Sequence, residues 1–313
     1  MAYMELIRPG TNYDFINSWR WAFALSGLFI AVSIASLVMR GGLNYGIDFT
    51  GGTLAQIHFK EKRTMEDVRQ GLTGAGLGDV LIQDFTDSFG SATTGVTGSE
   101  FLIRLPLAGE ETVDESTRVT KIAETAFGKE NIEIRRVESV GARVGEAFRW
   151  QAFLTVLVST IMMSLYIWWR FELRFGLGAW AALAHDVIIT VGAISIFNFE
   201  VDLTVVAALM TVVGFSVNDT VIISDRIREH MRRGRRENVA KTLNTSINET
   251  LSRTIINSGT ALLVTLALFF LGGNVIHGFA FALLVGFTVG TYSSIYIATP
   301  VVLMLAPSKA RGR

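Results

Sequence analysis

The feature that most constrains this chain is a series of long segments that carry almost no charge. A bilayer core about 30 Å thick is crossed by roughly 20 apolar residues in a helix. Segments of that kind occur at residues 21–39, 152–169, 175–197 and 203–223, and a Gly272-Gly273-Asn274 turn divides the stretch 254–306 into two more. The acidic, basic and histidine residues inside them are His185, Asp186, Asp219 and His277. The sequence therefore predicts an α-helical polytopic membrane protein with six transmembrane helices.

Composition agrees with this prediction and excludes several classes of protein. Of 313 residues, 50% are apolar and 18% charged, and the mean hydropathy of +0.41 is too high for an ordinary water-soluble chain. The 28 basic and 28 acidic residues cancel, so no charge excess favours nucleic acid. The chain has no cysteine and four scattered histidines. We therefore expect no disulfide, no metal site and no cofactor.

Basic residues in the connections predict the orientation, because lysine and arginine near helix ends are retained in the cytoplasm. The connection 224–253 contains eight basic residues, whereas 198–202 and 272–277 contain none. We expect this loop, residues 1–20 and the tail 307–313 to be cytoplasmic. Residues 40–149, with 13 basic and 17 acidic side chains, would then form a periplasmic domain.

Apolar alternation in residues 40–149 predicts a small α+β fold. The expected order is βαββαβ, typical of a ferredoxin-like sheet with two helices on one face. The polar segment 87–99 would be a mobile excursion. The expected strands are 54–59, 80–85, 101–105 and 132–137, and the expected helices are 65–72 and 113–127.

A glycine-rich motif, Gly46-Ile47-Asp48-Phe49-Thr50-Gly51-Gly52, follows the first span. Glycine permits positive φ, and an aspartate can accept hydrogen bonds from nearby backbone N–H groups. A tight turn accounts for the motif on local physics. No Gly-Lys-Ser/Thr follows it, which argues against nucleotide binding.

Asp219, preceded by Asn218, lies inside the fourth span, about 24 Å from the end that begins at Leu203. A charged side chain in a membrane helix costs a few kcal/mol, and desolvation favours the neutral form of a carboxyl group. Asp219 is therefore a candidate proton carrier. The alternative is a side chain that reaches the nearer cytoplasmic interface.

Three further residues are candidates beside Asp219. His185 and Asp186 lie near the middle of the third span, where a structural hydrogen bond and a proton relay are both compatible with the sequence. They should point about 100° apart, too far to face one partner. Arg253, just before the fifth span, is either a positive-inside anchor or a charge partner for Asp219. Apolar residues at every fourth position of 239–255 predict a helix that lies on the membrane surface.

Taken together, these residues resemble the SecF family of the bacterial SecDF protein-export complex, within the resistance-nodulation-division superfamily. The resemblance rests on the glycine motif, the domain that follows it, residues 213–220 and residues 248–254. It implies one inner-membrane chain that pairs with SecD, works with the SecYEG channel and often with YajC, and couples proton flow to a late step of polypeptide export. It implies no enzymatic activity.

By the same resemblance, Asp219 and Arg253 match residues of the family's proton pathway, and His185 and Asp186 have no assigned step. Gly46, Asp48, Phe49, Gly51, Gly52 and Asn218 belong to the family motifs. A passive scaffold of the translocase and half of a proton-driven small-molecule exporter are the alternatives. The exporter would be expected to have larger periplasmic domains than a segment of about 110 residues.

Overall fold

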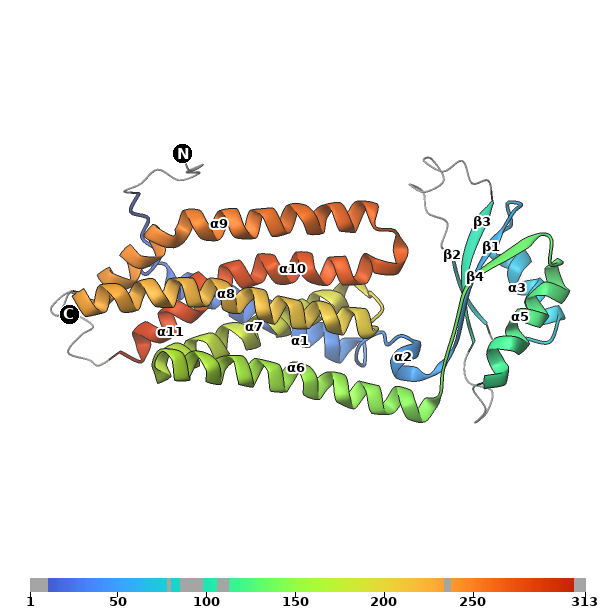
Figure 1. Ribbon diagram of the computed structural model, residues 1–313, viewed down its shortest axis with the longest axis horizontal. Coiled ribbons are helices and arrows are strands. Elements are labelled where there is room, and N and C mark those ends of the chain that lie inside the picture. The colour runs from blue at the N-terminus through green and yellow to red at the C-terminus, as the bar shows by residue number, and fades with distance from the viewer. Residues whose placement is uncertain (1–10, 78–79, 85–97, 106–112, 234–237, 307–313) are drawn as a thin grey trace.

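The computed structural model describes residues 11–77, 80–84, 98–105, 113–233 and 238–306. It is a long helical bundle with a four-stranded sheet at one end (Figure 1). Six helices of the described chain are long and apolar enough to cross a membrane, which confirms the predicted number of spans. The first five of these spans are α1 (Trp19–Met39), α6 (Ala142–Arg170), α7 (Leu173–Phe197), α8 (Leu203–Arg233) and α9 (Val239–Leu271).

The sixth span is composite. It consists of α10 (His277–Ser293), a π-helical turn η2 (Ser294–Ala298) and α11 (Thr299–Met304), and a 3₁₀ turn η1 (Asn274–Ile276) connects it to α9. A π turn leaves one residue out of the regular ladder, and Pro300 at the start of α11 lacks an N–H to donate. The backbone is therefore irregular immediately after Ser293.

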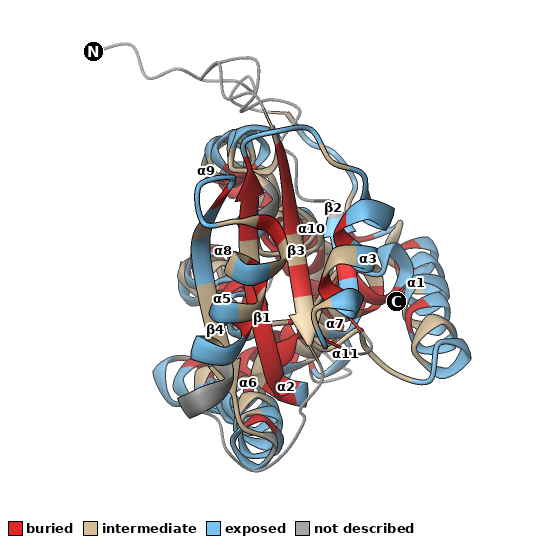
Figure 2. Ribbon diagram, turned by 90° about the vertical axis from the view of Figure 1, so that its right-hand side faces the viewer, coloured by how far each residue is buried: buried red, intermediate tan, exposed pale blue. Residues whose placement is uncertain are grey.

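The helices form an inner and an outer set. About half of the most apolar window is buried in α7, α8 and the sixth span, but only 17% in α1, α6 and α9. Figure 2 shows the pale exposed surfaces of the outer helices. Many of those exposed side chains are large and apolar, including Leu28, Val38, Met162, Leu263 and Val264. Such a surface suits a hydrocarbon environment.

Close packing inside the bundle uses small residues, as in other membrane helices. A Cβ added at Gly192 of α7 would collide with Ser33 of α1, and one at Gly286 of α10 would collide with Val212 of α8. At Gly290, four residues further along α10, a Cβ would lie 3.2 Å from Ser216 Cβ. Small residues of α10 therefore pack directly on α8.

One expectation about the basic segment is wrong. Residues 239–255 do not form a separate helix on the membrane surface, because α9 runs unbroken from Val239 to Leu271. Much of the expected loop 224–253 is also helical, since α8 continues to Arg233. The apolar stripe Val239, Leu243, Ile247 and Leu251 is buried in the bundle core together with Ile16 and Ile223. Packing against protein replaced the expected packing against lipid.

The sheet domain has the predicted order of elements. In sequence they are a short helix α2 (Ile47–Thr50), β1 (Gly52–Phe59), α3 (Met65–Gly74), β2 (Leu81–Asp84), β3 (Ser99–Leu105), α5 (Val113–Phe127) and β4 (Ile132–Val140). The strands are antiparallel in the order β2-β3-β1-β4. Central β1 and β3 are the most buried, as Figure 2 shows. Most of the segment 87–99 and all of the tail 307–313 lie outside the described residues.

The core of the sheet domain explains its elements. Ala55, Ile57 and Phe59 alternate along β1 and face one side of the sheet, where Val68 and Leu72 of α3 also pack. Val119 and Ala123 of α5 join the same cluster. Alternation with period two in strands and spacing of four in helices is the pattern from which both were predicted.

Candidate functional site

Asp219 lies fully buried on α8, at a contact with α9 and α10. Asn257 Nδ2 donates a hydrogen bond to Asp219 Oδ1 and Ser258 Oγ donates one to Oδ2, each at 3.2 Å. Thr291 Oγ1 of α10 in turn donates to Ser258 Oγ at 2.7 Å. Since charged carboxylates in a membrane interior require such donors or a proton, the site is one where protonation can change the local contacts.

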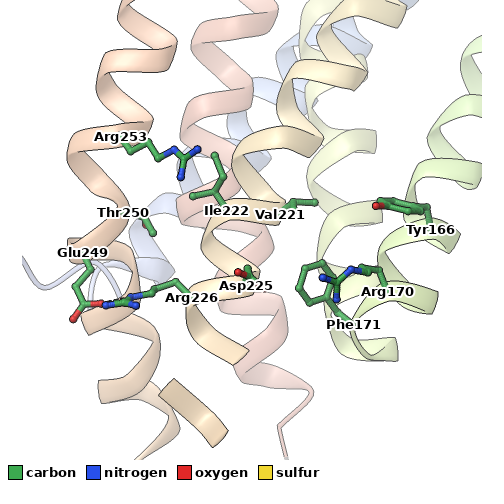
Figure 3. Close-up of a pocket in the computed structure, with 10 residues that line it drawn as sticks. All are labelled: Tyr166, Arg170, Phe171, Val221, Ile222, Asp225, Arg226, Glu249, Thr250 and Arg253. Atoms are coloured by element: carbon green, nitrogen blue, oxygen red, sulfur yellow. Dashed lines mark hydrogen bonds and ion pairs between the residues drawn. The ribbon is translucent and has the colours of Figure 1, made fainter. Parts of the chain in front are cut away.

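Asp219 has no cationic partner within 4 Å in the part of the chain that the structure describes. Arg253 of α9, its expected partner, is exposed and lines a cavity of about 530 Å³ between α6, α8 and α9, shown in Figure 3. Asn257, one turn further along α9, contacts Asp219 instead. The pairing of Arg253 with Asp219 remains a prediction for another conformation.

His185 and Asp186 form a second buried cluster, on α7. Asp186 Oδ2 accepts hydrogen bonds from Ser216 Oγ at 2.6 Å and Ser293 Oγ at 2.8 Å. Asp186 Oδ1 lies 3.0 Å from His185 Nδ1, so the two adjacent side chains contact each other although their Cα–Cβ directions diverge. His185 Nε2 is buried without a hydrogen-bond partner among the described residues.

The two clusters share two helices. On α8, Ser216 precedes Asp219 by three residues and therefore lies on nearly the same face. On α10, Thr291 belongs to the Asp219 cluster and Ser293 to the Asp186 cluster. Asn218, by contrast, is exposed on α8 and is not part of either cluster. The inner helices therefore bring Asp219 and Asp186 into one polar region.

Several residues of this region were not predicted as site residues. The stretch 254–306, from which only two spans were predicted, contains four of them, namely Asn257, Ser258, Thr291 and Ser293. Their spacing from Asp219 and Asp186 is set by contacts between helices, for which the sequence holds no periodic signal. A search for polar side chains inside predicted spans would have found them.

The glycine motif joins the sheet to the bundle. Gly51 has φ of 74° and Gly52 has φ of 126°, and a Cβ on Gly52 would lie 2.6 Å from Leu105 O. Both positions therefore need glycine. The predicted turn is built around the short helix α2, and buried Phe49 packs against Val201 and Phe281 of the bundle.

Contacts of the motif extend to the connection between α7 and α8. Gly46 N donates to Val201 O at 2.8 Å. Asp48 Oδ2 accepts a hydrogen bond at 2.9 Å from Leu203 N, the first residue of α8, and therefore caps that helix rather than its own turn. Arg104 of β3 forms an ion pair with Glu200 in the same connection. Displacement of the sheet would therefore act directly on the start of α8.

A second cavity, of about 1040 Å³, lies between the sheet and these helix ends, and Gln56, Asp48 and His277 are among its lining residues. The described residues include no group of three or more acidic, histidine or cysteine side chains placed to hold a metal ion. The chemistry of the site is thus that of carboxylates, hydroxyls and amides in a largely apolar bundle.

Comparison with known families assigns the chain. Residues 119–308 match the family of the protein export membrane protein SecD/SecF, C-terminal, and residues 36–62 match the SecD/SecF GG motif. The protein translocase subunit SecF of Vibrio alginolyticus is 45% identical over 309 residues, covering 97% of this chain and 93% of that protein. The chain belongs to the SecF family.

Other SecF proteins and solved structures agree. SecF of Escherichia coli O157:H7 is 38% identical, covering 94% of this chain and 88% of that protein. The crystal structure of SecDF, a translocon-associated membrane protein of a Thermus species, superimposes with a TM-score of 0.80 at 34% identity and covers 97% of this chain. SecDF in a super-membrane-facing form gives 0.66 at 37% identity. The SecF chain spans 39% of the length of each SecDF chain.

Proposed function

We propose that this SecF-family chain is a proton-coupled subunit of the protein-export machinery. It pairs with SecD and uses proton flow to drive a late step in the passage of a polypeptide through the SecYEG channel, with YajC as a possible further subunit. It is a transport subunit and not an enzyme. Asp219 is the principal proton-carrying residue, Arg253 is its electrostatic partner during the cycle, and His185 with Asp186 has a place in the same pathway.

The observation that carries this proposal is the environment of Asp219. The carboxyl group is fully buried, has no cation within 4 Å among the described residues, and accepts two long hydrogen bonds from α9. A buried carboxylate held so weakly gains little from remaining charged, and a change in its surroundings shifts its protonation. Protonation of Asp219 would in turn alter the contact between α8 and α9.

The contacts of the glycine motif support the coupling. The sheet is joined to the first residue of α8 through Asp48, and α8 carries Asp219 about 24 Å further along. A shift of α8 caused by protonation would therefore reach the sheet domain, which is proposed to help draw the emerging polypeptide outward.

The proposed location is the bacterial inner membrane, with both termini in the cytoplasm and residues 40–149 in the periplasm. The end of α8 and the start of α9, which carry most of the described basic residues of 224–253, lie at the opposite end of the bundle from the sheet (Figure 1). The backbones of Tyr13 and Phe15 hydrogen bond to Asn248 and Asn244 of α9 at that end. For the sheet domain we propose a ferredoxin-like fold, supported by its βαββαβ order and the strand order β2-β3-β1-β4.

The test is proton flux and polypeptide export with Asp219→Asn. The chain would be reconstituted with SecD and the channel in vesicles, with a pH-sensitive dye inside. Asparagine keeps the size and the hydrogen bonds but does not titrate, so we expect normal assembly and loss of the proton-driven stimulation of export. Glu133→Gln, which removes an exposed carboxylate from β4, is the control and should leave flux unchanged.

A passive scaffold would give a different result. It needs the same spans and domain but no titrating Asp219, so Asp219→Asn would export at the wild-type level and still respond to the proton gradient. That result would refute the proton-carrying role and favour the scaffold.

A further inference from the structure

Two arginines converge on one aromatic ring where α6 ends. The guanidinium carbon of Arg170 lies 5.2 Å from the centroid of the Phe171 ring, and that of Arg228 on α8 lies 5.7 Å from it. Arg228 Nη1 also donates a hydrogen bond at 3.3 Å to the backbone carbonyl of Arg170. Arg170, the last residue of α6, and Arg228, near the end of α8, therefore place two positive charges beside one ring.

Neither arginine has a carboxylate within 4 Å in the described chain, although acidic residues are near. Glu172 pairs with Arg174 at 2.7 Å, and Glu249 pairs with Arg226 and with His230. Asp225 is exposed and forms no ion pair with described residues. Two like charges held together without a counter-ion favour an anionic ligand, and guanidinium groups match the geometry of a phosphate.

The position of this pair along α6 corresponds to the headgroup level of a bilayer. Exposed Trp150 lies just over two turns inside the start of α6, and exposed Tyr166 and Trp169 lie near its end. The two tryptophans are 19 residues apart in sequence, which corresponds to about 28 Å along a helix and so to the thickness of a hydrocarbon core. Aromatic side chains concentrate at both interfaces, so Arg170 and Arg228 lie at one of them.

Arg170 and Phe171 line the cavity of about 530 Å³ in Figure 3, as do Asp225 and Arg226 of α8, and Arg228 lies beside it against the Phe171 ring. Its wall on α8 includes the apolar residues Val221 and Ile222. A phosphate at the arginines could therefore place adjoining apolar groups in the cavity, as a membrane lipid would. Basic pockets between membrane helices on the cytoplasmic side are suited to lipid headgroups.

We propose that Arg170, Arg228 and Phe171 form a binding site for the phosphate of an anionic phospholipid. The two guanidinium groups contact the phosphate oxygens, Phe171 holds both groups in place, and the glycerol and upper acyl chain lie against Val221 and Ile222. The site is separate from the proposed proton carrier, and the proposal does not depend on proton coupling.

The test measures lipid retention by native mass spectrometry of the full chain. The protein would be titrated separately with phosphatidylglycerol and with phosphatidylcholine, and inorganic phosphate would then be added to the complex with phosphatidylglycerol. We expect retained phosphatidylglycerol, and about 30-fold weaker retention in the double variant Arg170→Gln/Arg228→Gln, since each basic residue contributes about fivefold. The matched control Arg20→Gln/Arg232→Gln removes the same charge elsewhere and should change retention by less than about threefold.

Three results would overturn the proposal. Equal loss in the control would show that overall charge, and not this pair, retains the lipid. Displacement of phosphatidylglycerol by inorganic phosphate, or equal retention of phosphatidylcholine, would exclude an anionic-lipid site. Should the double variant not fold, the single change Arg170→Gln at the exposed end of α6 serves instead, with an expected loss of about fivefold.

Discussion

Asp186 and Asp219 are both buried carboxyl groups of the bundle, but they differ in the length and number of their hydrogen bonds. Asp186 accepts hydrogen bonds of 2.6 and 2.8 Å from serines on two other helices and contacts its neighbour His185 at 3.0 Å. Asp219 accepts two bonds of 3.2 Å, both from α9. Shorter, more numerous bonds to a carboxylate are the stronger ones. The hydrogen bonds of Asp186 therefore stabilise the contacts of α7 with α8 and α10, whereas those of Asp219 stabilise the contact of α8 with α9 only weakly.

This difference suggests which parts of the bundle move. A tightly bonded carboxylate stabilises one arrangement of helices, and a weakly bonded one can exchange partners at little cost. We infer that α7, α8 and α10 behave as one body and that the contact of α9 with α8 is the one that changes during a transport cycle. The predictions below test that contrast.

The largest effect should come from removing Asp186. Asp186→Leu leaves two serine hydroxyls and a histidine nitrogen without their acceptor, and we expect a loss of about 2 kcal/mol in the free energy of unfolding. Asp219→Leu removes a carboxylate with longer and fewer hydrogen bonds, so it should lower the free energy of unfolding by less than about 1 kcal/mol. Denaturant unfolding in detergent measures both, and equal losses would contradict the contrast.

Crowding the contact between α8 and α10 should destabilise the same unit. Gly286→Ala brings a methyl group into Val212, and we expect a loss of about 1.5 kcal/mol. The control is Gly214→Ala on α8, where a Cβ meets no atom within 4 Å and alanine favours the helix. Thermal unfolding of the two variants should shift in opposite directions, and a neutral Gly286→Ala would show that α10 can move away.

Removing the donors of Asp219 should affect transport more than stability. The double variant Asn257→Leu/Ser258→Ala takes away both hydrogen bonds to the carboxyl group, and we expect proton flux to change about tenfold with a small loss of stability. Ser216→Ala removes one donor from Asp186 but leaves Ser293 and His185 in contact with it, so it should change flux less than the double variant does. Dye-based flux in vesicles containing SecD distinguishes them, and the reverse ranking would assign the mobile contact to Asp186.

The smallest effect concerns an exposed carboxylate, which serves as a reference for the buried pair. Thr64 donates hydrogen bonds to Asp67 from its hydroxyl and from its backbone N–H, and these bonds lower the pKa of Asp67. A lowered pKa in the folded state stabilises the protein above the unfolded value of about 3.9, and this stabilisation is lost as the pH falls through the folded value.

Thr64→Ala should therefore flatten the acid side of the stability curve of the sheet domain slightly, without altering proton flux. Unfolding measured between about pH 5 and pH 2 checks this, because the unfolded-state pKa of about 3.9 lies within that range and the folded-state pKa of Asp67 is lower. An unchanged acid limb in the variant would show that the cap at α3 contributes nothing to the pH dependence.

Most of the helices and strands, and much of the candidate site, could be predicted from the sequence alone. Runs without charge identified the six spans because a membrane helix tolerates few ions, and period-two alternation identified the strands that follow the glycine motif. Asp219, Asp186 and His185 were recognisable because an ionisable group inside such a run is unfavourable without a function or a partner. These are local properties that each segment carries alone.

The groups that these residues contact could not be predicted from the sequence, because they depend on how the helices pack. By hydrophobicity, the apolar stripe of 239–255 could face either lipid or protein. In the structure it packs against protein, including apolar residues of α8. Sequence separations of 33 to 107 residues lie between the partners in the hydrogen bonds of Asn257, Ser258 and Ser293 with other helices. The periodicity of one helix cannot predict contacts over such separations. Asp48, expected to serve its own turn, caps α8 across 155 residues. Such contacts depend on how helices cross, which is set by the whole bundle at once.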